Sequence, residues 1–305
     1  MATVVPLIKD FSCEYGVIET VSPLIRRIVA RNPGPFTFKG TGTYVIGTGR
    51  VAVIDPGPDL EEHVEALLGA LNAEEITHIP VTHTHIDHSP ASGPVRAASG
   101  AKTFAFGPHG SGKASDGITV EEGGDHEFVP DVELRHGDVI EGDGWTLECV
   151  YTPGHTSNHL CYRLAEENAL FSGDHVMGWS TTVVSPPDGD MGEYMASLRM
   201  LLDRDEGIYW PTHGAPIRDP KPFLAALIAH REEREEQIAD CMARGIVQIP
   251  DMVAEMYKPL DPRLVPAARR SVFAHMIHMV ETDRAACDGT PAEDSRYRPA
   301  KRSGK

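Results

Sequence analysis

The spacing of hydrophobic and polar residues along the chain predicts strands interrupted by helices. Residues 42–58, GTYVIGTGRVAVIDPGP, hold two short apolar runs around a Gly-Thr-Gly-Arg turn, which is typical of a β-hairpin. Residues 59–73 have apolar side chains at helical spacing and acidic residues in the first turn, so we expect a helix. Residues 76–88 follow as a buried strand that ends in a histidine cluster.

The same kind of pattern continues towards the middle of the chain. It predicts strands, a hairpin and one further helix over residues 102–108, 145–156, 159–175, 192–205 and 207–214. Strict strand–helix–strand alternation is missing, which favours a layered α+β sandwich over a doubly wound sheet.

The pattern changes after Pro220. Three segments with helical periodicity, separated by Gly and Pro, predict a small helical domain over residues 221–290, and residues 1–220 form the main domain. The final stretch, SRYRPAKRSGK, is basic and poor in apolar residues, so residues 291–305 are expected to be a disordered tail.

The composition is ordinary for a globular protein, since 41% of the 305 residues are hydrophobic and 24% are charged. No apolar stretch approaches the roughly 20 residues that a membrane helix needs, and the N-terminus does not resemble a secretory signal. We therefore expect a cytoplasmic protein without membrane contact. The five cysteines are scattered and show no CxxC pairing, which favours free thiols.

The net charge of −17 lies almost entirely in the main domain. Residues 1–220 hold 14 basic and 32 acidic side chains, whereas residues 221–305 hold 14 and 13. An acidic body repels a polyanion, so the charge disfavours nucleic acid and favours a small-molecule substrate. A homodimer is left open.

Three histidines and an aspartate lie within VTHTHIDHSP, residues 81–90. His83 and His85 are two residues apart and face the same side of an extended chain. Imidazole nitrogens bind Zn²⁺ or iron, and catalytic zinc commonly takes three protein ligands and a water. His155, in the turn TPGHT, is the expected third ligand.

The remaining residues of the cluster are sufficient to begin a second metal site. Asp87 and His88 would be joined there by His213 of PTHG, and Asp174 of SGDH would bridge the two ions through its two oxygens. Two metals about 3.5–4 Å apart can hold a hydroxide between them and polarise the bond that it attacks. Donors of this kind suit two divalent ions, with zinc expected first and iron or manganese as alternatives.

These ordered motifs, HxHxDH, TPGHT, SGD and PTHG, resemble those of the metallo-β-lactamase superfamily over about residues 40–215. The resemblance implies an αββα sandwich with a dinuclear site at one edge, and the same assignment of ligands to the two metals. It also implies a supporting role beside the metals for Asp55, in the turn VIDPG.

Within the superfamily, the chain is most similar to the β-lactamase-like protein 2 group. The similarity lies in SGDHVMGWSTTVV, in EYMASLRML and in the helical residues 221–290, which would correspond to a winged-helix-like domain. Members of this group resemble endoribonucleases acting on single-stranded RNA in one branch and acyl-carrier thioesterases in another. The motifs do not choose between these branches.

The first functional hypothesis is hydrolysis of an acyl bond in a thioester, ester or lactone by a metal-bridging hydroxide. Asp87 would be both a metal ligand and a catalytic proton shuttle. The alternatives are a single-stranded-RNA endonuclease, whose basic channel would have to come from the C-terminal part, and a non-enzymatic binding module. Hydrolysis of β-lactams is expected at most as a side activity, because no secretion signal is evident.

The substrate pocket is harder to predict than the metal ligands. Trp179, Thr181 and Thr182 follow Asp174 closely and are candidates for its wall, although Trp179 could equally belong to the core. His159 and His175 neighbour metal ligands in sequence, and we expect them to support the site by hydrogen bonding or packing.

Overall fold

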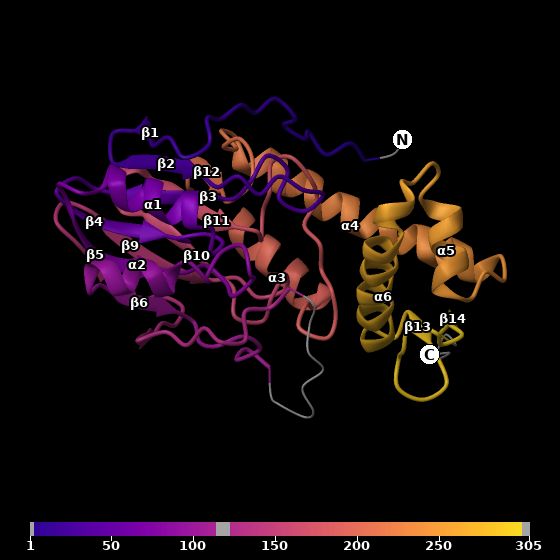
Figure 1. Ribbon diagram of the computed structural model, residues 1–305. Coiled ribbons are helices and arrows are strands. Elements are labelled where there is room, and N and C mark those ends of the chain that lie inside the picture. Colours follow the sequence, from indigo (N-terminus) through magenta and orange to yellow (C-terminus); the bar gives the residue numbers. More distant parts are fainter. Residues whose placement is uncertain (1–2, 114–122, 301–305) are drawn as a thin grey trace.

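Two mixed β-sheets lie face to face in the computed structural model of the chain, which describes residues 3–113 and 123–300 (Figure 1). The first sheet has the strand order β1-β2-β3-β4-β5-β6-β7 and the second has the order β12-β11-β10-β9-β8. The first contains β1 (Glu19–Ser22), β2 (Ile25–Val29), β3 (Gly42–Ile46), β4 (Arg50–Ile54), β5 (Glu75–Pro80), β6 (Lys102–Ala105) and β7 (Val132–Glu133). The second contains β8 (Val139–Glu141), β9 (Thr146–Tyr151), β10 (Leu160–Leu164), β11 (Ala169–Gly173) and β12 (Ile208–Pro211).

The alternation of side chains along each strand builds two separate cores. On β4, Ala52 and Ile54 point between the sheets, whereas Val51 and Val53 point outwards and pack beneath helices. The inner core also includes Tyr44, and β3 and β4 form the predicted hairpin with Tyr44 opposite Ile54. The predicted hairpin over residues 159–175 is likewise confirmed, as β10 and β11.

Helices cover the outer face of both sheets and complete the predicted αββα sandwich. Helices α1 (Glu61–Ala70) and α2 (Ser92–Ser99) contribute Leu67 and Val95 to the core over the first sheet. Helix α3 (Met191–Leu202) packs against the second sheet through side chains that include Tyr194. The short 3₁₀ helix η1 (Ala165–Glu167) connects β10 to β11.

The C-terminal part is helical, as predicted, and lies beside the sandwich (Figure 1). It contains α4 (Pro220–Ala243), α5 (Ile249–Met256), the 3₁₀ helix η2 (Pro262–Leu264) and α6 (Val265–Glu281). Helix α4 belongs to both parts: Phe223 and Leu227 pack in the core over the second sheet, whereas Ile238 and Met242 pack with α5 and α6. The two parts are therefore joined by a continuous helix, which begins at Pro220.

The prediction of a disordered tail over residues 291–305 is wrong for residues 291–300. Strand β14 (Arg298–Pro299) pairs antiparallel with β13 (Ala285–Ala286), and Tyr297 is only 1% exposed in the core of the C-terminal part. The prediction rested on the basic composition of this segment, but one buried aromatic side chain is large enough to anchor it. Residues 301–305 lie outside the described residues. Within the described part of the chain, no helix is long and apolar enough to cross a membrane.

Candidate metal centre

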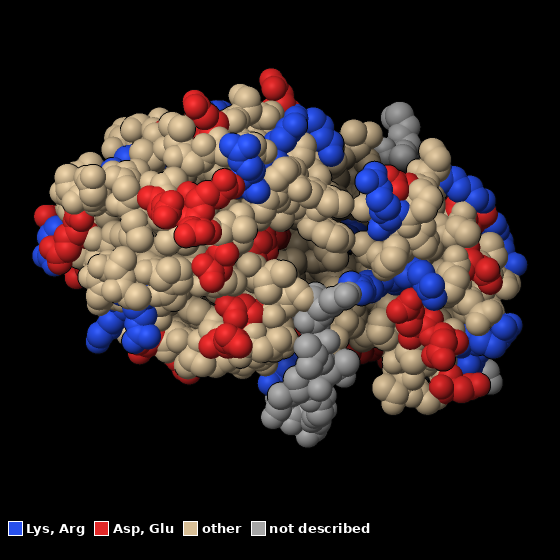
Figure 2. All heavy atoms as spheres, viewed as in Figure 1, with Lys and Arg blue, Asp and Glu red and all other residues tan. Residues whose placement is uncertain are grey.

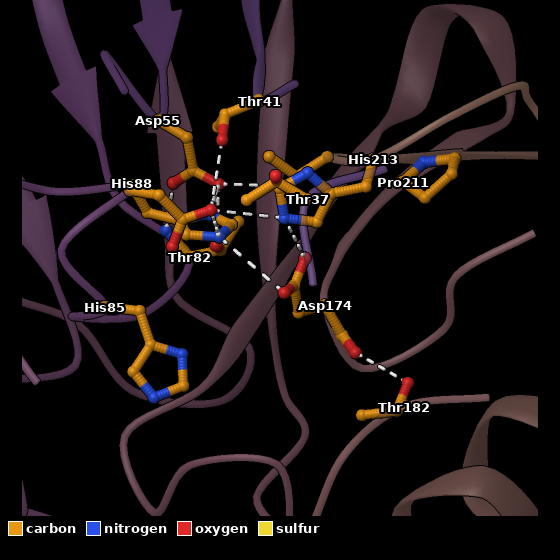
Figure 3. Close-up of polar contacts among 12 residues, drawn as sticks. Thr37, Thr41, Asp55, Thr82, His85, His88, Asp174, Thr182, Pro211 and His213 are labelled. Carbon is orange, nitrogen blue, oxygen red and sulfur yellow. Dashed lines mark hydrogen bonds and ion pairs between the residues drawn. The ribbon is translucent and has the colours of Figure 1, made fainter. Parts of the chain in front are cut away.

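The predicted ligands converge at one edge of the sandwich because each of them follows the end of a strand. The histidine cluster follows β5, His155 follows β9, Asp174 directly follows β11, and His213 lies two residues beyond β12. Figure 3 shows Asp174 joined by dashed lines to His88 and His213, with Asp55 beside His88. Loops held by a rigid sheet can thus bring side chains from distant parts of the sequence together.

Three imidazoles form the first group of donors. His85 Nδ1 lies 2.9 Å from His83 Nε2 and 3.2 Å from His155 Nε2. In a tetrahedral zinc site with bonds of about 2.0–2.1 Å, ligand atoms are about 3.3 Å apart. The nitrogens of His83, His85 and His155 therefore converge at a spacing suited to one metal ion.

The second group contains Asp87, His88 and His213. Asp87 Oδ2 lies 3.4 Å from His88 Nε2 and 3.2 Å from His213 Nε2. The carboxylate of Asp174 lies between the groups: Oδ1 is 3.4 Å from His213 Nε2, and Oδ2 is 3.8 Å from His155 Nε2. The structure therefore brings together all seven predicted ligands.

Unsatisfied polar atoms in the site test whether these residues fit a metal. His88 Nε2 and Asp174 Oδ1 are buried and have no hydrogen-bond partner among the described residues. Such atoms are rare in proteins, because leaving one without a partner costs about 1–3 kcal/mol. A cation between the carboxylates and the imidazoles would satisfy both atoms, so the donor set fits a metal centre.

Asp55, which was expected to support the metals, contacts several buried groups around the ligands. It is 1% exposed, and its Oδ1 accepts a hydrogen bond of 2.7 Å from the Thr82 backbone N–H. Its Oδ2 accepts from Thr82 Oγ1 at 2.7 Å and Thr212 Oγ1 at 3.3 Å, and lies 3.0 Å from His88 Nδ1 (Figure 3). The contact with His88 orients that ring so that Nε2 faces the other donors.

Other contacts orient the remaining rings. Backbone carbonyls of Gly40 and Val183 accept from Nδ1 of His213 and His155, at 3.1 and 2.6 Å. Because a carbonyl can only accept, each ring carries its proton on Nδ1 and leaves Nε2 available as a ligand. Thr41 Oγ1 donates to Asp87 Oδ2 at 3.0 Å and fixes that carboxylate.

The electrostatics of the metal-free site divide the histidines into two kinds. Burial and the neighbouring imidazoles hold the pKa of His83 and His85 well below the ordinary value, so both stay neutral. Burial also opposes protonation of His213, but the Asp174 and Asp87 carboxylates outweigh it and raise its pKa to about 10. Despite their burial, the pKa values of Asp87 and Asp174 are held well below normal by His88 and His213.

The raised pKa of His213 predicts how the stability of the metal-free protein depends on pH. The stability contributed by protonated His213 is fully present below pH about 6.5 and is lost as the pH rises towards about 10. We compare the free energy of unfolding of wild type and His213→Gln by urea titration in the presence of a chelator. The difference between the two proteins should decrease from pH 6.5 to pH 9.5, by up to about 1.4 kcal/mol per pH unit. An equal difference at both pH values would contradict the predicted protonation.

A cavity of about 490 Å³ opens directly over the metal centre. Its base includes His85, Asp87, His155, Asp174 and His213, and its walls come from the sandwich and from α6 of the C-terminal part. Figure 2 shows the molecule hollowed between these two parts. The ligands are thus accessible to a substrate that enters between the sandwich and the C-terminal helices.

The predicted pocket residues do not all face this cavity. Trp179 and Thr181 line it, and the Trp179 ring stacks on Phe38 with centroids 4.8 Å apart. Thr182 is 2% exposed and turns inwards, where its hydroxyl donates to the Asp174 carbonyl at 2.8 Å. Thr181 and Val183 line the cavity while Thr182 between them is buried, so the assignment of both threonines to the wall is corrected for Thr182.

His159 supports the site, as expected, through the Asp174 backbone N–H, which donates to its Nε2 at 3.3 Å. His175 packs instead, with its ring 4.7 Å from that of Tyr194. Sequence reasoning missed Thr41, which donates to Asp87, and considered the stretch around Arg270 only as part of a basic channel, whereas Arg270 lines the cavity. No local motif marks either residue, because only the tertiary fold brings them to the ligands.

The ligand geometry agrees with what family comparison finds. Residues 37–213 match the model of the metallo-beta-lactamase superfamily. The chain belongs to this superfamily. Residues 249–294 match the beta-lactamase associated winged helix domain, so the helical C-terminal part is a winged-helix region. The chain is thus a metallo-beta-lactamase-fold hydrolase with a His/Asp metal-binding cluster.

Relatives match most of the length of this superfamily member. It is 28% identical to the lactamase-like protein adaB of Aspergillus niger, over 96% of this chain and 95% of that protein. It is 29% identical to an atrochrysone carboxyl ACP thioesterase of Claviceps purpurea, over 80% of this chain and 75% of that protein.

Solved structures support the same fold. A beta-lactamase domain protein from Burkholderia ambifaria superposes with a TM-score of 0.78 at 21% identity, covering 95% of this chain and 96% of its own. A metallo-beta-lactamase family protein from Thermus thermophilus gives 0.74 at 22% identity, covering 92% and 100%. The arrangement of the sandwich and the winged-helix region therefore recurs in solved proteins.

Proposed function

We propose that this protein hydrolyses acyl thioesters with two divalent metal ions bound at the His/Asp centre. The observation that carries the proposal is the pair of donor groups that share Asp174 beneath an open cavity. Relatives named as acyl-carrier thioesterases support a thioester over the ester and lactone also considered.

The side chains around the cavity have separate tasks in this reaction. When bound, the metal ions supply Lewis-acid polarisation and a nucleophilic water at neutral pH. His83, His85 and His155 would hold one ion, Asp87, His88 and His213 would hold the other, and Asp174 would be shared by the two. Asp87 also lines the cavity, and its carboxylate would take a proton from the attacking water and pass it to the leaving thiolate.

An apolar part of the cavity wall favours a hydrophobic acyl group. Phe36 is 54% exposed at the cavity, and Met177, Trp179 and Val183 line it nearby. Covering exposed apolar side chains of this kind with an apolar group stabilises the complex by about 25 cal/mol per Å² of apolar surface removed from water. The acyl part of the substrate is therefore expected to pack against Phe36 and Trp179.

The charge of the cavity argues against RNA. Of the Asp, Glu, Lys and Arg side chains in the described part of the chain, those that line it are the ligands Asp87 and Asp174 and the basic Arg270. A nuclease of single-stranded RNA tracks the backbone with a positively charged groove. One arginine is suited instead to a single anionic group, such as the phosphate of a pantetheine arm.

Arg270 is expected to recognise such a group. It lies on α6 three residues after Ala267, so both face the cavity from the same side of the helix. Arg270→Gln should raise KM about tenfold for an acyl-coenzyme A, because a charge-assisted hydrogen bond contributes about 1.5–3 kcal/mol. KM for the N-acetylcysteamine thioester of the same acyl group, which has no phosphate, should stay unchanged.

Arg269→Gln is the matched control, since Arg269 pairs with Glu293 at 2.9 Å. It should leave both KM values unchanged. An equal rise of KM for both substrates in Arg270→Gln would contradict recognition of the phosphate.

The proposed function is tested by rates on one metal-loaded preparation. The panel contains acyl thioesters, lactones, a β-lactam and a labelled single-stranded RNA, with Asp87→Ala and His155→Ala as controls. We expect thioester turnover that both substitutions abolish, with the RNA left intact. RNA cleavage that both substitutions abolish, without thioester turnover, would replace this proposal by the endonuclease alternative.

A further inference from the structure

A short segment after Asp174 holds two metal ligands that come from different motifs. Thr182 Oγ1 donates to the Asp174 carbonyl at 2.8 Å (Figure 3) and also lies 3.1 Å from the His175 carbonyl. The next residue, Val183, accepts the Nδ1 proton of His155 at 2.6 Å. Movement of residues 182–183 would therefore shift a ligand of the first donor group and the carboxylate shared by both.

Regular secondary structure does not fix this segment. Residues 181–185 are neither helix nor strand, although Thr182 and Val184 are buried. The position of such a segment depends on its tertiary contacts. The contact to the Thr182 carbonyl comes from α4, the helix that joins the sandwich to the winged-helix region: Arg231 Nη2 donates a short hydrogen bond to it.

Arg231 is buried in an unusual way. It is 3% exposed, its Nε has no hydrogen-bond partner among the described residues, and no carboxylate of these residues lies within ion-pair distance. Burying an unpaired charge is costly, and an apolar side chain would fill the same space at lower cost. Packing alone therefore does not explain an arginine at this position.

The second contact of Arg231 connects it to the ligand His155 through Tyr194 and Gly154. Its guanidinium lies 5.2 Å from the centroid of the Tyr194 ring, which is fully buried at the start of α3. The backbone of Tyr194 touches Gly154, the residue before His155. A Cβ atom on Gly154 would lie 2.3 Å from Tyr194 Cα, and the φ of Gly154 is +134°, so only glycine fits this turn.

We propose that Arg231 is a positioning residue of the metal centre. From α4 it fixes the Thr182 carbonyl, and through residues 182–183 it sets the direction of His155 Nε2 and the place of the Asp174 carboxylate. The role of α4 thus extends beyond linking the two parts of the molecule, because it controls how well the donors match a metal ion. Removal of contacts that orient ligands typically lowers metal affinity 10- to 100-fold.

The test is metal affinity, measured without substrate and therefore independent of the proposed function. Arg231→Met keeps the length of the side chain and removes its donors, whereas Arg231→Lys keeps the charge and one donor group. Zn²⁺ affinity is measured by competition with a chromophoric chelator, and the ligand field by the visible absorption of bound Co²⁺. We expect Arg231→Met to weaken Zn²⁺ binding about 10- to 100-fold and to change the Co²⁺ spectrum, with recovery of most of the affinity in Arg231→Lys.

Arg234→Met is the matched control. Arg234 lies on the same helix, donates to Gln237 Oε1 at 2.7 Å and stacks over Tyr257, away from residues 182–183. It should leave Zn²⁺ affinity and the Co²⁺ spectrum at wild-type values. Wild-type affinity in Arg231→Met, or an equal loss in both methionine variants, would overturn the proposal.

Loss of folding in Arg231→Met is checked by thermal unfolding of the metal-free proteins. If that variant does not fold, Thr182→Val tests the same connection, because it keeps the shape of the side chain and removes the hydroxyl that holds the Asp174 carbonyl. Wild-type Zn²⁺ affinity in folded Thr182→Val would also contradict the proposed connection.

Discussion

Replacing Asp174 with alanine is expected to reduce hydrolysis by about 1,000-fold or more and to halve the bound metal. The two oxygens of this carboxylate lie 3.4 to 3.8 Å from imidazole nitrogens of both donor groups. The substitution therefore removes the anion that the two groups share. Stabilisation of charge at a buried site is the largest single contribution to many enzymatic rates, and the proposed metal pair would supply it here. The measurement is kcat/KM together with metal content by mass spectrometry after dialysis.

Two further variants show whether the effect is specific to the metals. Asp174→Asn keeps the size of the side chain but lacks the charge, and it should lose nearly as much activity as the alanine variant. Asp143→Asn removes an exposed carboxylate that belongs neither to the donor groups nor to the cavity wall, and it should change neither quantity. Full activity and two bound metals in Asp174→Ala would contradict the bridging role.

Replacing Asp55 with alanine is expected to have the largest effect on folding. The substitution removes the acceptor for the Thr82 N–H, the Thr82 hydroxyl and His88 Nδ1, all of which are buried. Each buried donor left without a partner costs about 1–3 kcal/mol. We therefore expect urea titration to show that the free energy of unfolding falls by about 3–5 kcal/mol, with Zn²⁺ affinity falling 10- to 100-fold through the freed His88 ring.

Asp55→Asn separates the backbone from the side chain. Asp55 has a φ of +47°, a left-handed conformation that Asn tolerates much better than Ala. The asparagine variant keeps one acceptor oxygen, so its stability should lie between those of wild type and Asp55→Ala. If Asp55→Asn proves as unstable as Asp55→Ala, backbone strain does not contribute to the alanine effect.

The metal ligands could be predicted because their chemistry is concentrated in short motifs at the ends of strands. His83, His85, Asp87 and His88 lie within six residues after a clear apolar run, and each of the other three ligands follows a strand that the hydrophobic pattern predicts. Clear periodicity also made α1, α3, the C-terminal helices and both hairpins predictable, whereas the short α2 was not predicted. These features are local, so the sequence alone contains them.

The residues that surround the ligands could not be predicted in the same way. Arg231 lies 49 residues from Thr182 in sequence, and no local pattern distinguishes it from the other charged residues of α4. The opposite directions of Thr181 and Thr182 depend on the path of an irregular segment, which tertiary contacts decide. Tyr297 was overlooked because one aromatic residue in a basic stretch gives no periodic signal.

Zinc titration of the metal-free protein tests the central claim most directly. Bound zinc and the rate of thioester hydrolysis are measured in the same samples as zinc is added. We predict no turnover without metal and a rate that rises to its maximum as the second equivalent binds. Full thioester turnover in the metal-free protein would contradict a dinuclear thioester hydrolase. The same holds if the wild type reaches its maximum rate with no more bound zinc than Asp174→Ala retains.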